Sequence, residues 1–400
     1  MSEIETTTRK GDLPQLLEML NAQNDVRYDV VVSSSGLEMR RGNLLINEGT
    51  ALITDDGVFT RDAELAPTPI FDEGVAHRFD IPMKYVRTMR ARVPSDEADI
   101  EAGAAWSPEW DAWTLYDRNV NYWLKADPSR RHLVRGFLKH SIGSENDEVG
   151  IARAFLSDRF KPIDNYDVLL AALAGVRAAG VEVDIDGDIS DRKMCVRMTS
   201  PEVREYAADL LDGYRSPFSG KEGSDNPCLF AGLVVKNSET GGGAFTIVPR
   251  LVVEVCSNGL QMTKDAVREV HLGGKLDEGV VKWSDETRRQ ELELVTARSR
   301  DAVATFLDID YMREKIDELR MLAEVTIEQP VKALERVARK QNWTDAEQQD
   351  ILTHFIAGGD TSALGVAQAV TAYAQTVTSP DRADDFESHA LAAATLAVAG

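Results

Sequence analysis

The hydrophobic pattern of this chain changes its period near residue 284, and that change limits the folds open to it. Before this point, stretches such as 27–60 alternate apolar and polar residues between Gly and Asn breaks, which is the period of β-strands. After it, Val303, Ile316 and Leu319 recur at helical spacing. We therefore predict an α+β fold, an antiparallel sheet with packed helices, followed by a C-terminal all-helical extension.

Three regions follow from this pattern: an N-terminal arm over 1–26, an α+β core domain over 27–283 and a helical C-terminal region over 284–400. No run of about eighteen apolar residues is present, so we expect no membrane span. The N-terminal segment MSEIETTTRKGDLPQ lacks an apolar signal core, and the three widely spaced cysteines fit reduced thiols. We therefore expect a cytoplasmic protein.

Within the core, periodicity and turn residues place the individual elements. Helices are predicted over 79–93, 108–125, 164–179 and about 201–213. Adjacent strands are predicted over 131–138 and 149–157, and a hairpin over 181–198 whose acidic strand faces the basic residues of its partner. Two more strands lie in LFAGLVVK and AFTIVPRLVVEVCS, where Pro249 predicts a bulge or an edge position.

The stretch AFLSDRFKPIDNYDVL, residues 154–169, concentrates polar groups where a strand leads into a helix. A helix N-terminus attracts anions, Asp164 can cap that helix, and Arg159 with Lys161 could grip a phosphate. The local alternative is that Asp158 and Asp164 only pair with these two cations and cap the turn. Taken alone, the stretch favours the local alternative.

A second polar stretch, KNSETGGGAF at 236–245, places three consecutive glycines between two strands. Glycine permits close backbone approach, so such a loop can present N–H groups to a phosphate. It lacks the spacing of a Walker loop. The structural alternative is a flexible hairpin loop, and for VCSNGL at 255–260 a tight turn at Asn258 and Gly259 is the better interpretation.

Two further features have both a binding and a structural interpretation. The aromatic residues of 108–125 could stack on bases, but aromatics at helical spacing are more often core residues. One basic set lies either on an exposed strand edge or on a phosphate track: Arg130, Arg131, Arg135 and Lys139.

Catalytic and metal-binding patterns are not found in the sequence. The six histidines form no set with zinc-ligand spacing, and HExxH, GxSxG and GxGxxG are all missing. The acidic run DIDGDISD at 184–191 lacks the glutamate that completes a calcium-binding loop, and a hairpin turn explains it better. We therefore expect no metal and no cofactor, and the sequence favours a protein without enzymatic activity.

Three blocks together resemble a known family: GIARAFLSDRFKPIDNYDVL, KNSETGGGAFTIVPRLVVEVCSNGL and ITDDG…HRFDIPMKYVRTM. They resemble the phage/plasmid-related protein family, whose function is unknown, over residues from about 50 to about 275. The resemblance implies a mobile-element protein in the cytoplasm of a bacterial host. It also implies a remote similarity to the ring-forming single-strand annealing proteins of phage recombination, and hence a homo-oligomer.

This resemblance implies single-stranded DNA binding and annealing in phage or plasmid recombination and replication. The corner and the glycine loop would then hold phosphates while the bases stay free to pair. The implied DNA contacts are Arg153, Arg159, Lys161, Asn165, Lys236, Asn237, Ser238, Gly241, Gly242, Gly243, Arg250 and Lys264.

Two alternatives remain open because the net charge is −22, which opposes loose binding of the whole surface to nucleic acid. One is a non-enzymatic phage interaction protein, an anti-defence or host-takeover factor that binds a host protein; the acidic C-terminal region could recruit a host or phage partner. The other is an enzyme that acts on nucleotides or nucleic acids with Asp158, Asp164 and Glu239 as acid/base groups or Mg²⁺ ligands.

Overall fold

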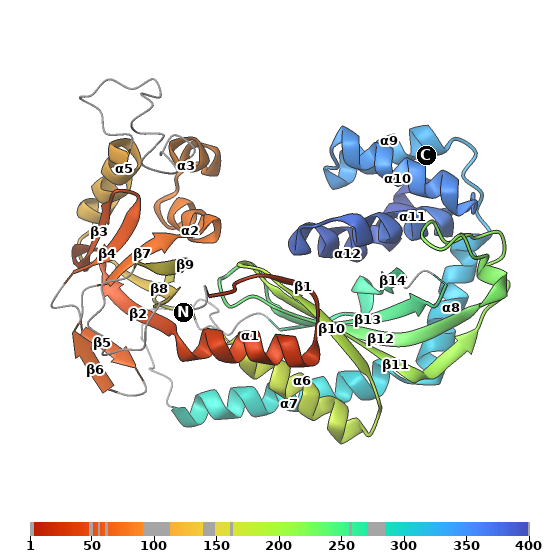
Figure 1. Cartoon of the computed structure of the whole chain (residues 1–400), viewed down its shortest axis with the longest axis horizontal. Coiled ribbons are helices and arrows are strands. Elements are labelled where there is room, and N and C mark those ends of the chain that lie inside the picture. Colours follow the sequence, from red (N-terminus) through yellow and green to blue (C-terminus); the bar gives the residue numbers. More distant parts are fainter. Residues whose placement is uncertain are drawn as a thin grey trace.

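The described part of the chain forms two large sheets, each with its own helices, as Figure 1 shows. The computed structural model describes residues 4–47, 51–54, 57–60, 63–90, 113–138, 149–160, 163–255, 258–269 and 285–398. In this part of the chain, no helix combines the length and apolarity that crossing a bilayer requires. The predicted α+β class with a helical C-terminal region is confirmed.

The first sheet, here called sheet B, has six strands. In spatial order they are β2 (Arg27–Ser33), β8 (Arg131–Phe137), β9 (Gly150–Ser157), β7 (Ala63–Pro67), β4 (Asn43–Ile46) and β3 (Leu37–Arg40). The pairs are antiparallel except β7 with β9. A separate hairpin joins β5 (Ala51–Thr54) to β6 (Gly57–Thr60).

Three helices pack on sheet B and bury its apolar face: α2 (Pro69–Phe79), α3 (Met83–Arg90) and α5 (Trp113–Ala126). The predicted helix over 79–93 is wrong at its start, because Phe79 ends α2 and Asp80 has a left-handed backbone with φ of 54°. Its last residues, 91–93, lie outside the described part. On α5, Tyr116, Val120 and Leu124 are buried, as helical spacing predicted.

The outer edge of sheet B is strand β3, and a side chain of α5 covers part of its backbone. Met39 donates its N–H to Asn121 Oδ1 at 2.7 Å, and Asn121 Nδ2 donates to the Met39 carbonyl at 2.8 Å. One amide side chain therefore satisfies both backbone groups that β3 presents at this residue.

The second sheet, here called sheet A, joins the N-terminal arm to the middle of the chain. Its spatial order is β1 (Thr8–Asp12), β10 (Asp184–Ile189), β11 (Met194–Tyr206), β12 (Cys228–Asn237), β13 (Phe245–Val253) and β14 (Asn258–Gln261), with β15 (Val267–Glu269) also on β13. Its apolar face, which includes Leu229, Leu233 and Ile247, shares one core with α1 (Leu13–Asp25), α6 (Asn165–Ala179) and α7 (Asp285–Phe306).

Five helices complete the C-terminal region: α8 (Ile309–Ala323), α9 (Pro330–Gln341), α10 (Asp345–Gly358), α11 (Ala363–Thr376) and α12 (Pro380–Val398). Asp308 separates α7 from α8 because its carboxylate accepts from the N–H groups of Asp310 and Tyr311. Figure 1 shows α11 and α12 above sheet A, whereas α1, α6 and α7 lie below it. Helices α11 and α12 therefore cover the second face of sheet A.

Three local predictions in sheet A are wrong. The helix expected near 201–213 is replaced by the end of β11, whose pairing with β12 shifts register between Thr199 and Arg204. This irregularity accommodates Pro201, which cannot donate to a regular ladder. Gly259 is not in a turn but in β14, where it pairs with Val252.

Pro249 lies in an interior strand, not at a bulge or an edge. On one side of β13, residues 245–247 pair with β15 and residues 250–253 pair with β14. Pro249 falls between these two partners. Its missing N–H therefore costs no hydrogen bond to either strand.

Candidate nucleic-acid interface

The polar corner at 157–165 and the glycine-rich loop at 236–245 meet in space. The N–H of Asn165, the first residue of α6, donates to Glu239 Oε2 at 3.0 Å. Asn237 Nδ2 donates to Asn165 Oδ1 at 2.9 Å and to the Ile163 carbonyl at 2.8 Å. Both asparagines are buried. Residues of the two stretches that were expected to bind phosphate therefore bind one another.

Arg135 lies at the centre of this junction, with a side chain only 1% exposed. Its guanidinium contacts Asp29 at 2.7 Å and Asp164 at 2.6 Å, and it donates to the Glu239 carbonyl at 2.8 Å. The interpretation of Arg135 as part of an exposed edge or a phosphate track is wrong. Asp164, which Arg27 also contacts, makes no side-chain cap for α6, because these arginines engage its carboxylate.

Arg153 forms the second buried pair of the junction. Its Nη1 lies 2.6 Å from Glu239 Oε1, and its guanidinium lies 4.2 Å from the centre of the Phe137 ring. Burial raises the pKa of Glu239, but Arg153 and Arg135 outweigh it and lower that pKa to about 2. Glu239 is thus a poor proton acceptor near neutral pH, which argues against its proposed role as a catalytic base.

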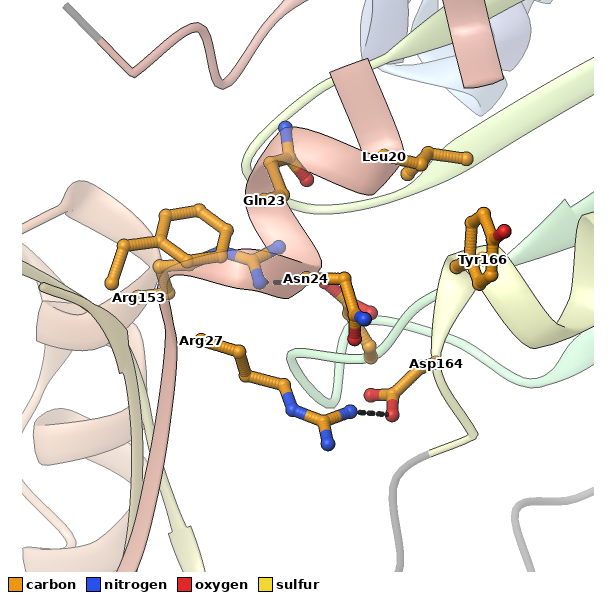
Figure 2. A pocket seen from close by; sticks show the side chains of 9 residues that line it. Leu20, Gln23, Asn24, Arg27, Arg153, Asp164 and Tyr166 are labelled. Atoms are coloured by element: carbon orange, nitrogen blue, oxygen red, sulfur yellow. Dashed lines mark hydrogen bonds and ion pairs between the residues drawn. The ribbon is translucent and has the colours of Figure 1, made fainter. Parts of the chain in front are cut away.

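A small cavity remains between α1, α6 and this junction, as Figure 2 shows. Its volume is about 20 Å³, which is room for about one water molecule. Its lining residues are Leu20, Gln23, Asn24, Arg27, Phe137, Arg153, Asp164, Tyr166 and Glu239. The cavity is too small for a phosphate group or a nucleotide.

The glycine loop itself folds onto the tip of the β10–β11 hairpin. Ser238 Oγ donates to the Arg192 carbonyl at 2.6 Å and accepts from the Gly242 N–H at 2.8 Å. Gly241 has φ of 86°, which explains a glycine at this position. Gly241, Gly242 and Gly243 are exposed, but Ser238 already satisfies the amide of Gly242.

Two predicted phosphate contacts face the acidic helix α12. Lys236 Nζ lies 2.6 Å from Asp384 Oδ1 and donates to Ser388 Oγ at 2.7 Å. Arg250 is buried beneath the same helix, and Gly259 leaves room for its guanidinium: a Cβ there would lie 1.7 Å from Arg250 Nε. Neither side chain is open to solvent in this arrangement.

The remaining predicted contacts differ in their surroundings. Arg159 and Lys264 are exposed, and neither has an ion pair among the described residues. Lys161 lies outside the described part of the chain. Five predicted contacts do not line an open groove in this structure, because each is buried: Arg153, Asn165, Asn237, Ser238 and Arg250. All but Arg250 have hydrogen-bond or ion-pair partners within the described residues.

A different surface of sheet B combines arginines that are partly or fully exposed with aromatic rings. We call it the arginine–aromatic surface and define it by Arg78, Arg130, Arg131, Tyr122 and Trp123. Trp123 is 40% and Tyr122 is 66% exposed, and their rings meet at 5.5 Å. Trp123 also stacks on Phe79 at 6.5 Å, and Arg130 lies 5.9 Å above the same ring. These contacts make the surface continuous.

A buried histidine orients one arginine of this surface. Arg78 Nε donates to His132 Nδ1 at 3.4 Å, and Arg78 Nη2 donates to the Arg131 carbonyl at 3.1 Å. Burial, reinforced by Arg78 and Arg130, lowers the pKa of His132 to about 3, so the imidazole is neutral. His132 Nε2 lies 2.9 Å from Ser34 Oγ, which fixes the ring.

The arginines of this surface have few acidic neighbours. Burial and the charge of Arg130 lower the pKa of Arg78, while Asp158 raises it. Arg131 Nε lies 3.9 Å from Asp158, whereas Arg78 and Arg130 form no ion pair within the described residues. Two arginines that form no ion pair within the described residues make this part of the surface locally positive in a chain whose net charge is −22.

The sequence contained part of this signal. Arg130 and Arg131 belonged to the basic set, and Trp123 and Tyr122 to the aromatic helix, but the two patterns were interpreted separately. Arg78 lay in the HRFDIPMKYVRTM block but was not predicted to contact a ligand. Only the packing of α2 and α5 on β8 brings the three segments together.

Metal and family comparisons give no assignment. Within the described ranges, no group of three His, Cys, Asp or Glu side chains could hold a metal ion. No family model, no curated protein and no solved structure matches the chain. Any function must therefore be argued from the surface itself.

Proposed function

We propose that this protein binds single-stranded DNA through the arginine–aromatic surface and promotes strand annealing in phage or plasmid recombination. The observation that carries the proposal is the pair Arg78 and Arg130: they lie beside the exposed rings of Tyr122 and Trp123 and form no ion pair with any described residue. Arginines attract the phosphate backbone, and aromatic rings stack on unpaired bases of any sequence. A duplex hides those base faces, which favours a single strand.

The annealing step needs no catalytic group. A protein that holds phosphates leaves the base edges free, so a complementary strand can pair. The surface suits this role, because guanidinium groups contact phosphate whereas only two rings are exposed for stacking. Arg159, which is exposed and follows β9, could extend the phosphate contacts.

The test is a fluorescence-anisotropy titration of a labelled single-stranded oligonucleotide over a series of salt concentrations. Replacing Arg78 and Arg130 by glutamine should weaken binding and reduce the slope of log K against log salt by about 1.4, because each phosphate contact on a single strand contributes about 0.7. The matched control is Arg339→Gln with Lys340→Gln, two exposed cations of α9.

The control should leave the slope unchanged, although it changes the net charge equally. Absence of binding by the wild-type protein at low salt would overturn the proposal. Equal losses in both double variants would reduce it to a general charge effect. The proposed annealing activity is then tested with two complementary labelled strands, whose pairing is monitored by energy transfer between the labels.

A further inference from the structure

The second face of sheet A, opposite its apolar core, carries a set of cations. We call Lys193, Arg197, Lys236 and Arg250 the cation row; they lie on or next to β11, β12 and β13. Arg197 pairs within the sheet, with Asp188 at 2.7 Å and Asp186 at 2.6 Å. Lys193, Lys236 and Arg250 face helix α12, which covers this side of the sheet.

Helix α12 places its carboxylates over the cation row. Asp384 Oδ2 accepts from Lys193 Nζ at 2.7 Å, and Asp384 Oδ1 lies 2.6 Å from Lys236 Nζ. Asp385 lies 3.6 Å from Lys193. Two lysines on neighbouring strands thus converge on a single carboxylate, as they could on a phosphate.

Arg250 is the member of the row that α12 leaves unmatched. It is 7% exposed, its Nε has no hydrogen-bond partner, and no ion pair is found for it within the described residues. Burial lowers the pKa of Arg250, and Glu387 is the carboxylate that opposes this most. The Glu387 carboxylate, however, accepts a hydrogen bond from Gln261 Nε2 at 3.1 Å. Burying a cation is costly where no carboxylate pairs with it, which is the situation of Arg250 among the described residues, and a bound anion would reduce that cost.

The contact between α12 and this face differs from ordinary core packing. Buried ion pairs contribute little net stability, since desolvation offsets their attraction. A polyanion that supplies equivalent charges can therefore replace the α12 carboxylates at lower cost than exposing an apolar face. The apolar residues Phe386, Ala390 and Ala394 of α12 are buried with residues of α9 and α11, and Phe386 contacts the rings of Trp343 and Tyr373.

We infer that the cation row is a second phosphate-binding surface for single-stranded DNA and that α12 closes it. This inference rests on the proposed DNA-binding function and adds its regulation. In the protein without DNA, Lys193 and Lys236 are paired with Asp384. A long strand first held at the arginine–aromatic surface competes with α12 for Lys193, Lys236 and Arg250.

The test compares two double variants with equal charge change. Asp384→Asn with Glu387→Gln removes the carboxylates over the row, and Glu328→Gln with Asp350→Asn removes two exposed carboxylates elsewhere. The first should raise affinity for a labelled single strand roughly 5- to 150-fold, the usual range for coupled sites. Its salt slope should steepen by about 2, for three added phosphate contacts. The control should change neither.

Adding Lys193→Gln and Lys236→Gln to the first variant should abolish the gain. If the wild type binds and the first variant shows no gain, or the same gain as the control, the inference fails while the proposed function stands. If the wild type does not bind but the first variant does, the proposed surface fails and the cation row stands. If neither binds, both fail.

A measurement on the wild-type protein guards against a variant that does not fold. Hydrogen exchange with and without the oligonucleotide should show faster exchange in 380–398 and slower exchange in 228–253 when DNA is bound. Unchanged or slower exchange in 380–398 under saturating DNA would overturn the inference.

Discussion

The arginines around Arg135 and those around Arg78 have opposite surroundings, although both lie on sheet B or beside it. Arg135 and Arg153 are buried and have carboxylates within 2.7 Å. Arg78 and Arg130 have no such partner among the described residues and lie next to exposed rings. The first group holds elements together, and the second is available to a ligand. Pairing, not the density of basic residues, therefore separates a structural arginine from a binding one.

The largest expected effect is at the buried junction. Glu239→Gln should lower the free energy of unfolding by about 3–5 kcal/mol, because it leaves the buried guanidinium of Arg153 without its carboxylate. Urea denaturation measures it, with Glu222→Gln, an exposed partner of Arg215, as the control. A loss below about 1 kcal/mol, typical of surface pairs, would remove the contrast between the two arginine groups.

Acid should weaken the same junction. The pKa of Glu239 in the folded protein is about 2, below its ordinary 4.5, so its ionised form is favoured by folding. The stabilisation is present above pH 4.5 and is lost as the pH falls toward 2. Over this pH range, the midpoint temperature of thermal unfolding should fall more steeply for the wild type than for Glu239→Gln. Parallel curves would contradict the assignment.

At the arginine–aromatic surface, the expected effects are on binding and not on folding. Trp123→Ala should weaken single-strand binding by about 1–3 kcal/mol, the contribution of one base stacked on an aromatic ring. Anisotropy measures the loss, and Tyr206→Ala, another exposed aromatic on sheet A, is the control. Equal affinities of wild type and Trp123→Ala would mean that DNA does not reach this ring.

The smallest effect is expected at Arg131, whose charge Asp158 partly offsets at 3.9 Å. Arg131→Gln should reduce the salt slope by less than the roughly 0.7 of a full phosphate contact on a single strand. A titration of the single variant beside Arg130→Gln compares the two. A larger slope change for Arg131→Gln than for Arg130→Gln would show that the Asp158 pair does not tune binding.

Local sequence patterns predicted much of the fold. The helix over 164–179 and the strands at 131–138 and 149–157 follow from periodicity, and α6, β8 and β9 confirm them. The hairpin prediction that acids face bases is confirmed by Arg197 with Asp186. The helix expected near 201–213 is wrong because pairing between Arg204 and Phe230 extends β11, and a distant strand overrides local preference.

The candidate site could not be predicted in the same way. Arg135 contacts Asp29, which lies 106 residues earlier, and Arg153 contacts Glu239 in another sheet's loop. No local spacing encodes such pairs, because the topology of both sheets decides them. The sequence therefore showed where polar residues concentrate but not which of them neutralise one another.

The amide of Asn121 has a consequence for association between copies of the chain. By occupying the backbone N–H and carbonyl of Met39, it takes the positions that an incoming strand would use. The Asn121 side chain therefore prevents a strand of another copy from pairing with β3 at Met39, whether in a fibre or by strand exchange. Any ring of subunits has to use other contacts there, and loss of this amide would leave both backbone groups of Met39 open to a strand from another copy.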